Sequence, residues 1–186
     1  MFEIRIHGRG GQGVVTAAEM LSIAAFEQGK YSQAIPSFGS ERMGAPVVAY
    51  VRIDDQPIEL YEPVMSPDLL IIQDSTLFHA VDVFSGLKPD GFVLVNTERE
   101  LDELHIDEVV CDLPDHHVVT VAATTLAIHH LGRATPNTVL LGALTALTDV
   151  IDFDSVVKAI HAKFSGEVAA NNITAAQAAY DLAQLA

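Results

Sequence analysis

The chain has 186 residues, of which 49% are hydrophobic and 19% charged, and its formal net charge is −15. This composition predicts one compact domain over 1–186 and excludes a disordered protein. The negative charge repels phosphate backbones, so no nucleic-acid partner is expected. No uncharged stretch reaches the roughly 20 apolar residues that span a bilayer, and the first residues do not resemble a signal peptide. We therefore expect a cytoplasmic protein with no membrane contact.

Charge and cysteine content narrow the chemistry further. Residues 1–53 carry five basic and four acidic residues, about +1, and the remainder carries the other −16. A solvated acidic surface in the second part explains this difference, and an N-terminal part that accepts an anion or docks a partner is the alternative. Cys111 is the only cysteine, so it can form neither an internal disulfide nor a cysteine-ligated iron–sulfur cluster. Its apolar neighbours predict a core position.

Hydrophobic periodicity predicts strands alternating with helices in the first half of the chain. A glycine-rich turn at 8–13 follows the first strand, and Gly29 ends the first helix. The turn after Asp54 favours a hairpin over 47–60. The predicted strands are 4–7, 31–35, 47–53, 58–60, 69–73 and 92–96, and the predicted helices are 14–28 and 76–84.

The second half is mostly helical in pattern. Asp154 and Asn172 are the predicted N-caps of its last two helices. The predicted strands are 109–113 and 118–121, and the predicted helices are 122–131, 136–149, 154–164 and 172–185. Together the pattern predicts a Rossmann-like α/β fold, in which helices flank a mostly parallel twisted sheet, with a β-hairpin addition and a helical C-terminal layer.

The sequence HGRGGQG at 7–13 is the most informative segment. It lies between the first strand and the first helix, where free backbone N–H groups and the helix dipole favour an anion. Gly8, Gly10 and Gly13 have the G-x-G-x-x-G spacing. However, Asp74 lies too far along the chain to be the usual ribose-binding acid, and Glu27 lies in the predicted helix. No Walker lysine is present, so the motif does not support NTP hydrolysis. A turn that merely allows tight packing is an equal alternative.

A second Gly-, Pro- and Ser-rich loop, PSFGSERMGAP, spans 36–46. Its Glu41 and Arg42 offer hydrogen bonds at the tip of the loop, or form an exposed pair of little consequence. The adjacent histidine pairs at 116–117 and 129–130 point their side chains apart, so they do not form a metal site. No nucleophile signature is present either, and we predict no catalytic and no metal-binding residue in this chain.

Four segments together resemble the gamma subunit, or gamma domain, of the 2-oxoacid:ferredoxin oxidoreductases, closest to the pyruvate (pyruvate synthase) branch. They are HGRGGQGVVTAAEML, FGSERMGAPVVAYVRIDD, LLIIQDSTL and GFVLVNTE. The resemblance covers essentially the whole chain. It departs at one point, because the family usually has two consecutive arginines in the second loop, whereas here Met43 follows Arg42.

The resemblance implies a role in oxidative decarboxylation of a 2-oxoacid with coenzyme A (CoA), which gives an acyl-CoA and CO2 and passes electrons to ferredoxin. It implies alpha, beta and delta-type partner subunits, which hold thiamine diphosphate, Mg and the iron–sulfur clusters, and a chain that is inactive and binds no cofactor alone. An isolated chain could self-associate through a bare interface.

The resemblance also implies that this subunit lies on the CoA side. The residues predicted to contact CoA are Arg9, Gly10, Gly11, Gln12, Gly13 and Arg42. Docking of subunits is a competing role for the same loops. Two other interpretations of the chain stay open, namely a stand-alone nucleotide- or NAD-binding protein and a purely structural subunit.

Overall fold

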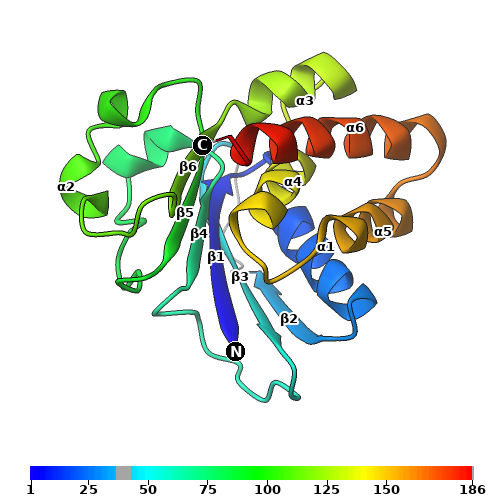
Figure 1. The fold of residues 1–186 in the computed structure, drawn as a ribbon, viewed down its shortest axis with the longest axis horizontal. Helices are drawn as coiled ribbons and strands as arrows, with labels where there is room; N and C mark the ends of the chain where they lie inside the picture. The colour runs from blue at the N-terminus through cyan, green and yellow to red at the C-terminus, as the bar shows by residue number, and fades with distance from the viewer. Residues whose placement is uncertain (37–42, 186) are drawn as a thin grey trace.

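A six-stranded mixed sheet forms the centre of the computed structural model, which describes residues 1–36 and 43–185 (Figure 1). The strand order is β2-β3-β1-β4-β5-β6. Strands β1, β4, β5 and β6 run parallel, and β3 runs antiparallel to both of its neighbours, β1 and β2. The strands are β1 (Phe2–Arg9), β2 (Tyr31–Pro36), β3 (Pro46–Asp54), β4 (Leu69–Ile72), β5 (Phe92–Asn96) and β6 (Val118–Val121). The predicted α/β class with a mostly parallel sheet is confirmed.

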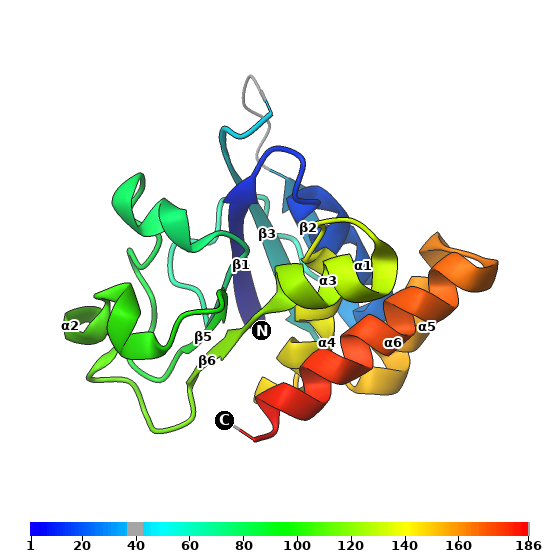
Figure 2. The same cartoon turned by 90° about the horizontal axis from the view of Figure 1, so that it is seen from above.

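Five helices gather on one side of this sheet (Figures 1 and 2). They are α1 (Val14–Glu27), α3 (Ala123–Leu131), α4 (Asn137–Leu147), α5 (Phe153–Lys163) and α6 (Gly166–Ala183). Apolar side chains of β1 and β3 alternate toward these helices, so Ile4, Ile6 and Val51 are fully buried in the larger core. This arrangement confirms the predicted helical C-terminal layer.

The other side of the sheet has a thinner cover of short elements. The 3₁₀ helices η1 (Ser75–His79) and η2 (Leu101–Leu104) and helix α2 (Asp107–Val110) enclose a second, smaller core. Val93 and Val95 of β5 point into this second core, while Leu94 between them points into the larger one. Both faces of the central parallel strands are therefore buried, as expected for strands with a continuous apolar sequence.

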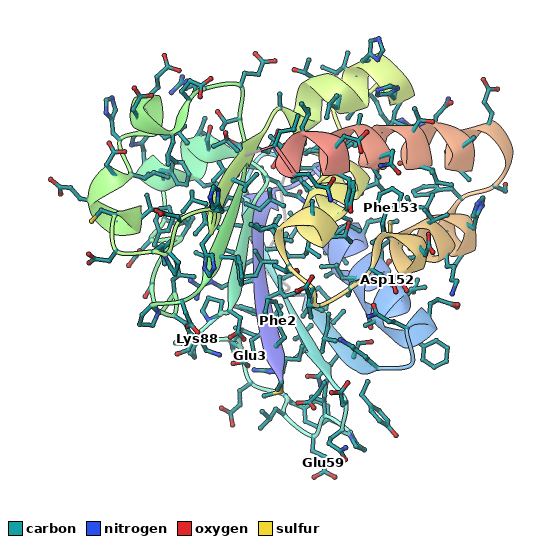
Figure 3. The ribbon with its side chains drawn as sticks, viewed as in Figure 1. Phe2, Glu3, Glu59, Lys88, Asp152 and Phe153 are labelled. Atoms are coloured by element: carbon teal, nitrogen blue, oxygen red, sulfur yellow. The ribbon has the colours of Figure 1, made fainter. Side chains whose placement is uncertain are left out.

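An ion pair and a backbone hydrogen bond join elements at the end of the sheet where β1 begins, and Figure 3 shows Glu3 and Lys88 at this end. The N–H of Glu3 donates to the Asp68 carboxylate at 2.7 Å, and Lys88 pairs with the same carboxylate at 2.7 Å. Asp152 caps α5 by accepting a hydrogen bond from the N–H of Ser155. The glycine-rich turn lies at the opposite, carboxyl end of β1, away from these contacts.

The predicted hairpin over 47–60 is wrong. Strand β3 pairs along its whole length with β1, from Phe2 opposite Ile53 to Arg9 opposite Pro46, and its other edge pairs with β2. Because both edges of β3 are already hydrogen-bonded, 58–60 has no edge to join and lies outside the strands. The antiparallel addition to the sheet is therefore the pair β2 and β3.

Two further predictions in the middle of the chain are wrong. The helix expected over 76–84 is only the single turn η1, which Asp74 caps through the N–H of Thr76. The strand expected over 109–113 is instead α2 and a turn, because acidic residues in its first turn favour a helix and Val110 packs into the second core. Cys111 follows α2 and is exposed, so its predicted core position is also wrong.

The last two helices begin earlier than predicted. Helix α5 has Asp152 as its N-cap in place of Asp154, and α6 begins at Gly166 with Ser165 as its N-cap residue. Asn172 lies inside α6, where its buried amide donates to the carbonyl of Val168 and accepts from the hydroxyl of Thr138. This polar contact joins α6 to α4. Within the described residues, no helix is long and apolar enough to cross a membrane.

Gly142 sets the distance between α4 and α6. A methyl group at this position would overlap the carbonyl oxygen of Ala176 in the backbone of α6. We expect Gly142→Ala to lower the free energy of unfolding by about 3 kcal/mol, because helix backbones cannot move apart without opening the core. Urea unfolding measures this loss. Ala146→Ser, at a half-buried position of α4, is the control and should change it by less than about 1 kcal/mol.

His7 makes the fold sensitive to acid. Burial, together with the charge of Arg5, lowers the pKa of His7 to about 4. The unfolded chain protonates His7 below about pH 6.5, whereas the folded chain does not until about pH 4. The stability of the fold that depends on a neutral His7 is therefore fully present above about pH 6.5. On the order of 3 kcal/mol of the free energy of unfolding is lost as the pH falls to about 4.

We expect His7→Gln to flatten this part of the stability profile. Chemical unfolding at pH 7 and at pH 4.5 measures the difference between the two proteins. The exposed His79, changed to Gln, is the control. An unchanged pH dependence in His7→Gln would mean that another group causes the loss.

Candidate functional site

The glycine-rich loop, residues 8–13, lies at the carboxyl end of β1. The neighbouring parallel strand β4 ends at Ile72, and Gln73 and Asp74 follow it at the same edge of the sheet. The N–H of Gln73 donates to the carbonyl of His7, which extends the pairing of β1 with β4 up to the loop. Carboxyl ends of parallel strands are the usual place for ligands in open α/β sheets.

Asp74 anchors the glycine-rich loop by binding two side chains of that loop. Arg9 Nε lies 3.2 Å from Oδ2 of Asp74, and Gln12 Nε2 donates to the same oxygen at 2.9 Å. Arg9 also donates to the hydroxyl of Thr76 at 2.8 Å and to the carbonyl of Gly44 at 3.0 Å. The other end of the Gln12 amide accepts the N–H of Arg9 at 2.7 Å. Both side chains therefore hold the loop in one conformation.

The second loop is tied to the first by backbone hydrogen bonds. The N–H of Gly10 donates to the carbonyl of Ala45 at 2.9 Å, and the N–H of Gly44 donates to the carbonyl of Gly10 at 3.1 Å. Met43, 86% exposed, lies over the loop, since a methyl group added to Gly11 would be 2.9 Å from its Cε. The described end of the second motif, residues 43–46, thus forms one surface with the glycine-rich loop.

The Asp74 carboxylate stays ionised in this setting. Burial raises its pKa, but hydrogen bonds from Thr76 and Gln12 and the positive charge of Arg9 lower it, and the resulting pKa lies below the ordinary value. The anchor is therefore charged throughout the neutral range. It weakens only under strong acid, as the pH falls through that lowered pKa.

Gly13 begins α1 in the left-handed conformation, with φ 77° and ψ 31°. A methyl group on Gly13 would lie 2.5 Å from Nδ2 of Asn137, the buried first residue of α4. No hydrogen bond to another described residue uses the N–H groups of Gly11, Gly13 and 14–16. These donors converge where the helix dipole is positive, so the arrangement suits an anion.

The structure brings five of the six predicted site residues together. Arg9, Gly10, Gly11, Gln12 and Gly13 form the loop, and Arg42 lies outside the described residues. The side-chain groups of Arg9 and Gln12 are bonded within the protein, so the free donors are backbone N–H groups.

Sequence reasoning missed the roles of Asp74, Thr76 and Asn137. Asp74 does follow a fully apolar strand, but it lies far from the glycine-rich loop in the sequence. Local patterns therefore did not predict its contact with Arg9 and Gln12. Adjacent parallel strands end at the same edge of a sheet, and this was the signal that could have found it.

The described residues do not suit a metal or an iron–sulfur cluster. No group of three or more His, Cys, Asp and Glu side chains within 1–36 and 43–185 is arranged to hold a metal ion. Cys111 is the sole cysteine of the chain and is exposed directly after α2. A cluster needs several thiolate ligands close together, and these residues do not fit one.

Comparison with known proteins gives consistent matches over the whole chain. The family model described as pyruvate ferredoxin/flavodoxin oxidoreductase matches residues 3–182. The pyruvate synthase subunit PorC of Methanothermobacter marburgensis is 48% identical over 181 residues, 97% of each chain. The pyruvate/ketoisovalerate oxidoreductases common subunit gamma of Pyrococcus abyssi is 46% identical and covers 100% of this chain and 98% of its own.

Solved structures agree with these matches. The pyruvate oxidoreductase subunit PORC of Thermotoga maritima has a TM-score of 0.81 and 36% identity, over 97% of this chain and 96% of its own. A 2-oxoglutarate:ferredoxin oxidoreductase of Magnetococcus marinus, solved with 2-oxoglutarate, CoA and succinyl-CoA bound, contains the same fold within a longer chain. Its TM-score is 0.75 at 20% identity, and the match covers all of this chain and 31% of that one.

Similarity of this extent in sequence and in fold assigns the chain to the pyruvate ferredoxin/flavodoxin oxidoreductase family, as a gamma subunit of a pyruvate/2-oxoacid:ferredoxin oxidoreductase.

Proposed function

We propose that the glycine-rich loop of this subunit binds the pyrophosphate of CoA in the assembled oxidoreductase. The observation that supports this role is the group of backbone N–H donors at Gly11, Gly13 and 14–16, which have no partner among the described residues. Backbone donors at the start of a helix are a common way to bind phosphate. Gly13 leaves no side chain to block the approach of the ligand.

In this proposal the loop side chains have different tasks. Arg9 and Gln12 keep the loop in place through Asp74, so the N–H groups are oriented before the ligand arrives. Preorganised donors bind more tightly, because less conformational freedom is lost on binding. Arg42 of the second loop, which lies outside the described residues, supplies a positive charge to the site.

The gamma subunit of Pyrococcus abyssi supports a role on the CoA side. That protein is a subunit common to pyruvate and ketoisovalerate oxidoreductases. A subunit shared by enzymes for different 2-oxoacids can contact what their reactions have in common, and CoA is the shared co-substrate. Selection of the 2-oxoacid then falls to other subunits, and we propose pyruvate for this enzyme from the names of its relatives.

The rest of the reaction is placed on partner subunits. Alpha, beta and delta-type chains supply thiamine diphosphate, Mg and the iron–sulfur clusters, and ferredoxin accepts the electrons of the complex. The described residues of this chain offer no ligand set for these groups. We propose that the complex works in the cytoplasm, that this chain alone is inactive, and that it can self-associate when isolated.

Subunit docking is a second candidate role for the same loops. The observation that favours it is Met43, which is 86% exposed beside Gly11 at the tip of the surface. A flexible, exposed apolar side chain is typical of a contact with another protein. Kinetics and assembly together separate the two roles, because docking variants lower the yield of complex without changing the KM for CoA.

Gly13→Ala is the direct test of the loop. The new methyl group would strain a residue with φ 77° and crowd Asn137, so we expect the KM for CoA to rise by about tenfold or more, which corresponds to at least about 1.4 kcal/mol. The KM for pyruvate should not change. Steady-state kinetics of the assembled enzyme with a dye acceptor give both values.

Gly29→Ala is the matched control for this test. Gly29 also has a positive φ, +80°, but it lies at the other end of α1 and a methyl group there would contact nothing within 4 Å. The control should keep the KM for CoA of the unmodified enzyme. Equal effects of the two variants would show that general destabilisation, and not the loop, causes the change.

Arg42→Ala tests the charge of the second loop. We expect a rise of about tenfold in the KM for CoA, since a charged hydrogen bond to phosphate contributes about 1.5–3 kcal/mol. The rise should become smaller at high ionic strength, which screens exposed charges. An unchanged KM at low salt would remove Arg42 from the site, and a loss of assembled complex would favour docking.

A further inference from the structure

A second anion site is suggested by a cavity of about 310 Å³ on the helical side of the sheet. Gly13 and Thr16 form one wall, so the cavity continues directly from the glycine-rich loop. The segment between α3 and α4 and the ends of α5 and α6 form the other walls. Its size lies at the lower end of cavities that hold small ligands, about 300–1,000 Å³.

The charge of this cavity differs from that of the whole chain. Arg133 and Lys163 both line it and no carboxylate does, although the chain has 25 acidic and only 10 basic residues. The guanidinium of Arg133 makes no ion pair or hydrogen bond with any residue in the described part of the chain. Two positive side chains beside one cavity, with no carboxylate among its lining residues, favour a negatively charged ligand.

Lys163 is held only loosely by its present partner. It pairs with Glu19 at 2.6 Å, but the two side chains are 39% and 48% exposed. Exposed pairs of this kind contribute little to stability, so the ammonium group is free to turn toward a stronger anion. Thr16, Thr135 and Asn137 add hydroxyl and amide groups to the same walls.

We propose that this cavity binds the 3′-phosphate on the ribose of CoA. The inference rests on the proposed function of the loop, which takes the pyrophosphate of the same molecule. The 3′-phosphate is a phosphomonoester and carries close to two negative charges at neutral pH. Backbone N–H groups alone do not neutralise such a charge, whereas the planar fork of Arg133 binds phosphate through two hydrogen bonds. The ammonium of Lys163 adds a second positive charge.

Dephospho-CoA, which lacks only the 3′-phosphate, makes this inference testable in the assembled enzyme. We expect the unmodified enzyme to prefer CoA over dephospho-CoA. The measure of this preference is the KM for dephospho-CoA divided by the KM for CoA. In Arg133→Gln this ratio should fall by about tenfold, equivalent to about 1.4 kcal/mol, because the KM for CoA rises and that for dephospho-CoA stays the same. Arg133→Lys should restore part of the preference.

Lys158→Gln is the matched control, since Lys158 is an exposed lysine of α5 that does not line the cavity. It should keep the preference of the unmodified enzyme. An unmodified enzyme that treats the two compounds alike, or an Arg133→Gln variant that raises both KM values equally, would overturn the inference. Inorganic phosphate is a further probe. If it inhibits the enzyme equally with CoA and with dephospho-CoA, and Arg133→Gln relieves this inhibition, the cavity is a site for free phosphate instead.

The two proposals fail in different ways. If Gly13→Ala leaves both KM values unchanged, the loop does not bind CoA and the proposed function falls. If Gly13→Ala raises both KM values and Arg133→Gln leaves their ratio unchanged, the loop function stands and the cavity does not bind the 3′-phosphate.

Discussion

The carboxylate of Asp74 is the contact on which the candidate site depends. It follows β4 and binds Arg9 and Gln12 of the loop that follows β1. Two strand ends that meet only because the sheet is parallel are thereby joined by one charged group. Since the pKa of Asp74 lies below the ordinary value, this carboxylate stays ionised at neutral pH. Without it, a loop with three glycines in four residues would sample many conformations, and its N–H groups would not converge on one point.

The group formed by Asp74, Arg9 and Gln12 has almost no net charge. Arg9 and Asp74 cancel one another, and the side-chain amide of Gln12 is bonded at both ends. The positive potential at the loop therefore comes from the backbone at the start of α1. Arg133 and Lys163 line the cavity of which Gly13 forms one wall. An acidic chain can thus present a local site for an anion without a cluster of arginines in the motif itself.

Much of this arrangement could be predicted from local sequence. The apolar runs that became β4 and β5 and the loop that precedes α1 are short-range patterns, and they are confirmed in type. The errors occurred where distant contacts decide the structure. Residues 58–60 form no strand because β1 and β2 occupy both edges of β3, and Asp74 is joined to the loop across more than 60 positions of sequence. Hydrophobic periodicity contains no information on either contact, because it reports only which face of an element is buried.

The helical layer explains why the site and the core are linked. Gly13 packs against Asn137 at the start of α4, and Gly142 of the same helix lets α6 approach to backbone contact. Asn172 and Thr138 then fix α6 on α4 through a buried hydrogen bond. The walls of the cavity beside the loop are therefore the ends of packed helices and the short segment between α3 and α4. A site built in this way keeps its shape without a ligand, so binding costs little reordering, and any change that separates α4 from α6 also moves the groups that face Gly13.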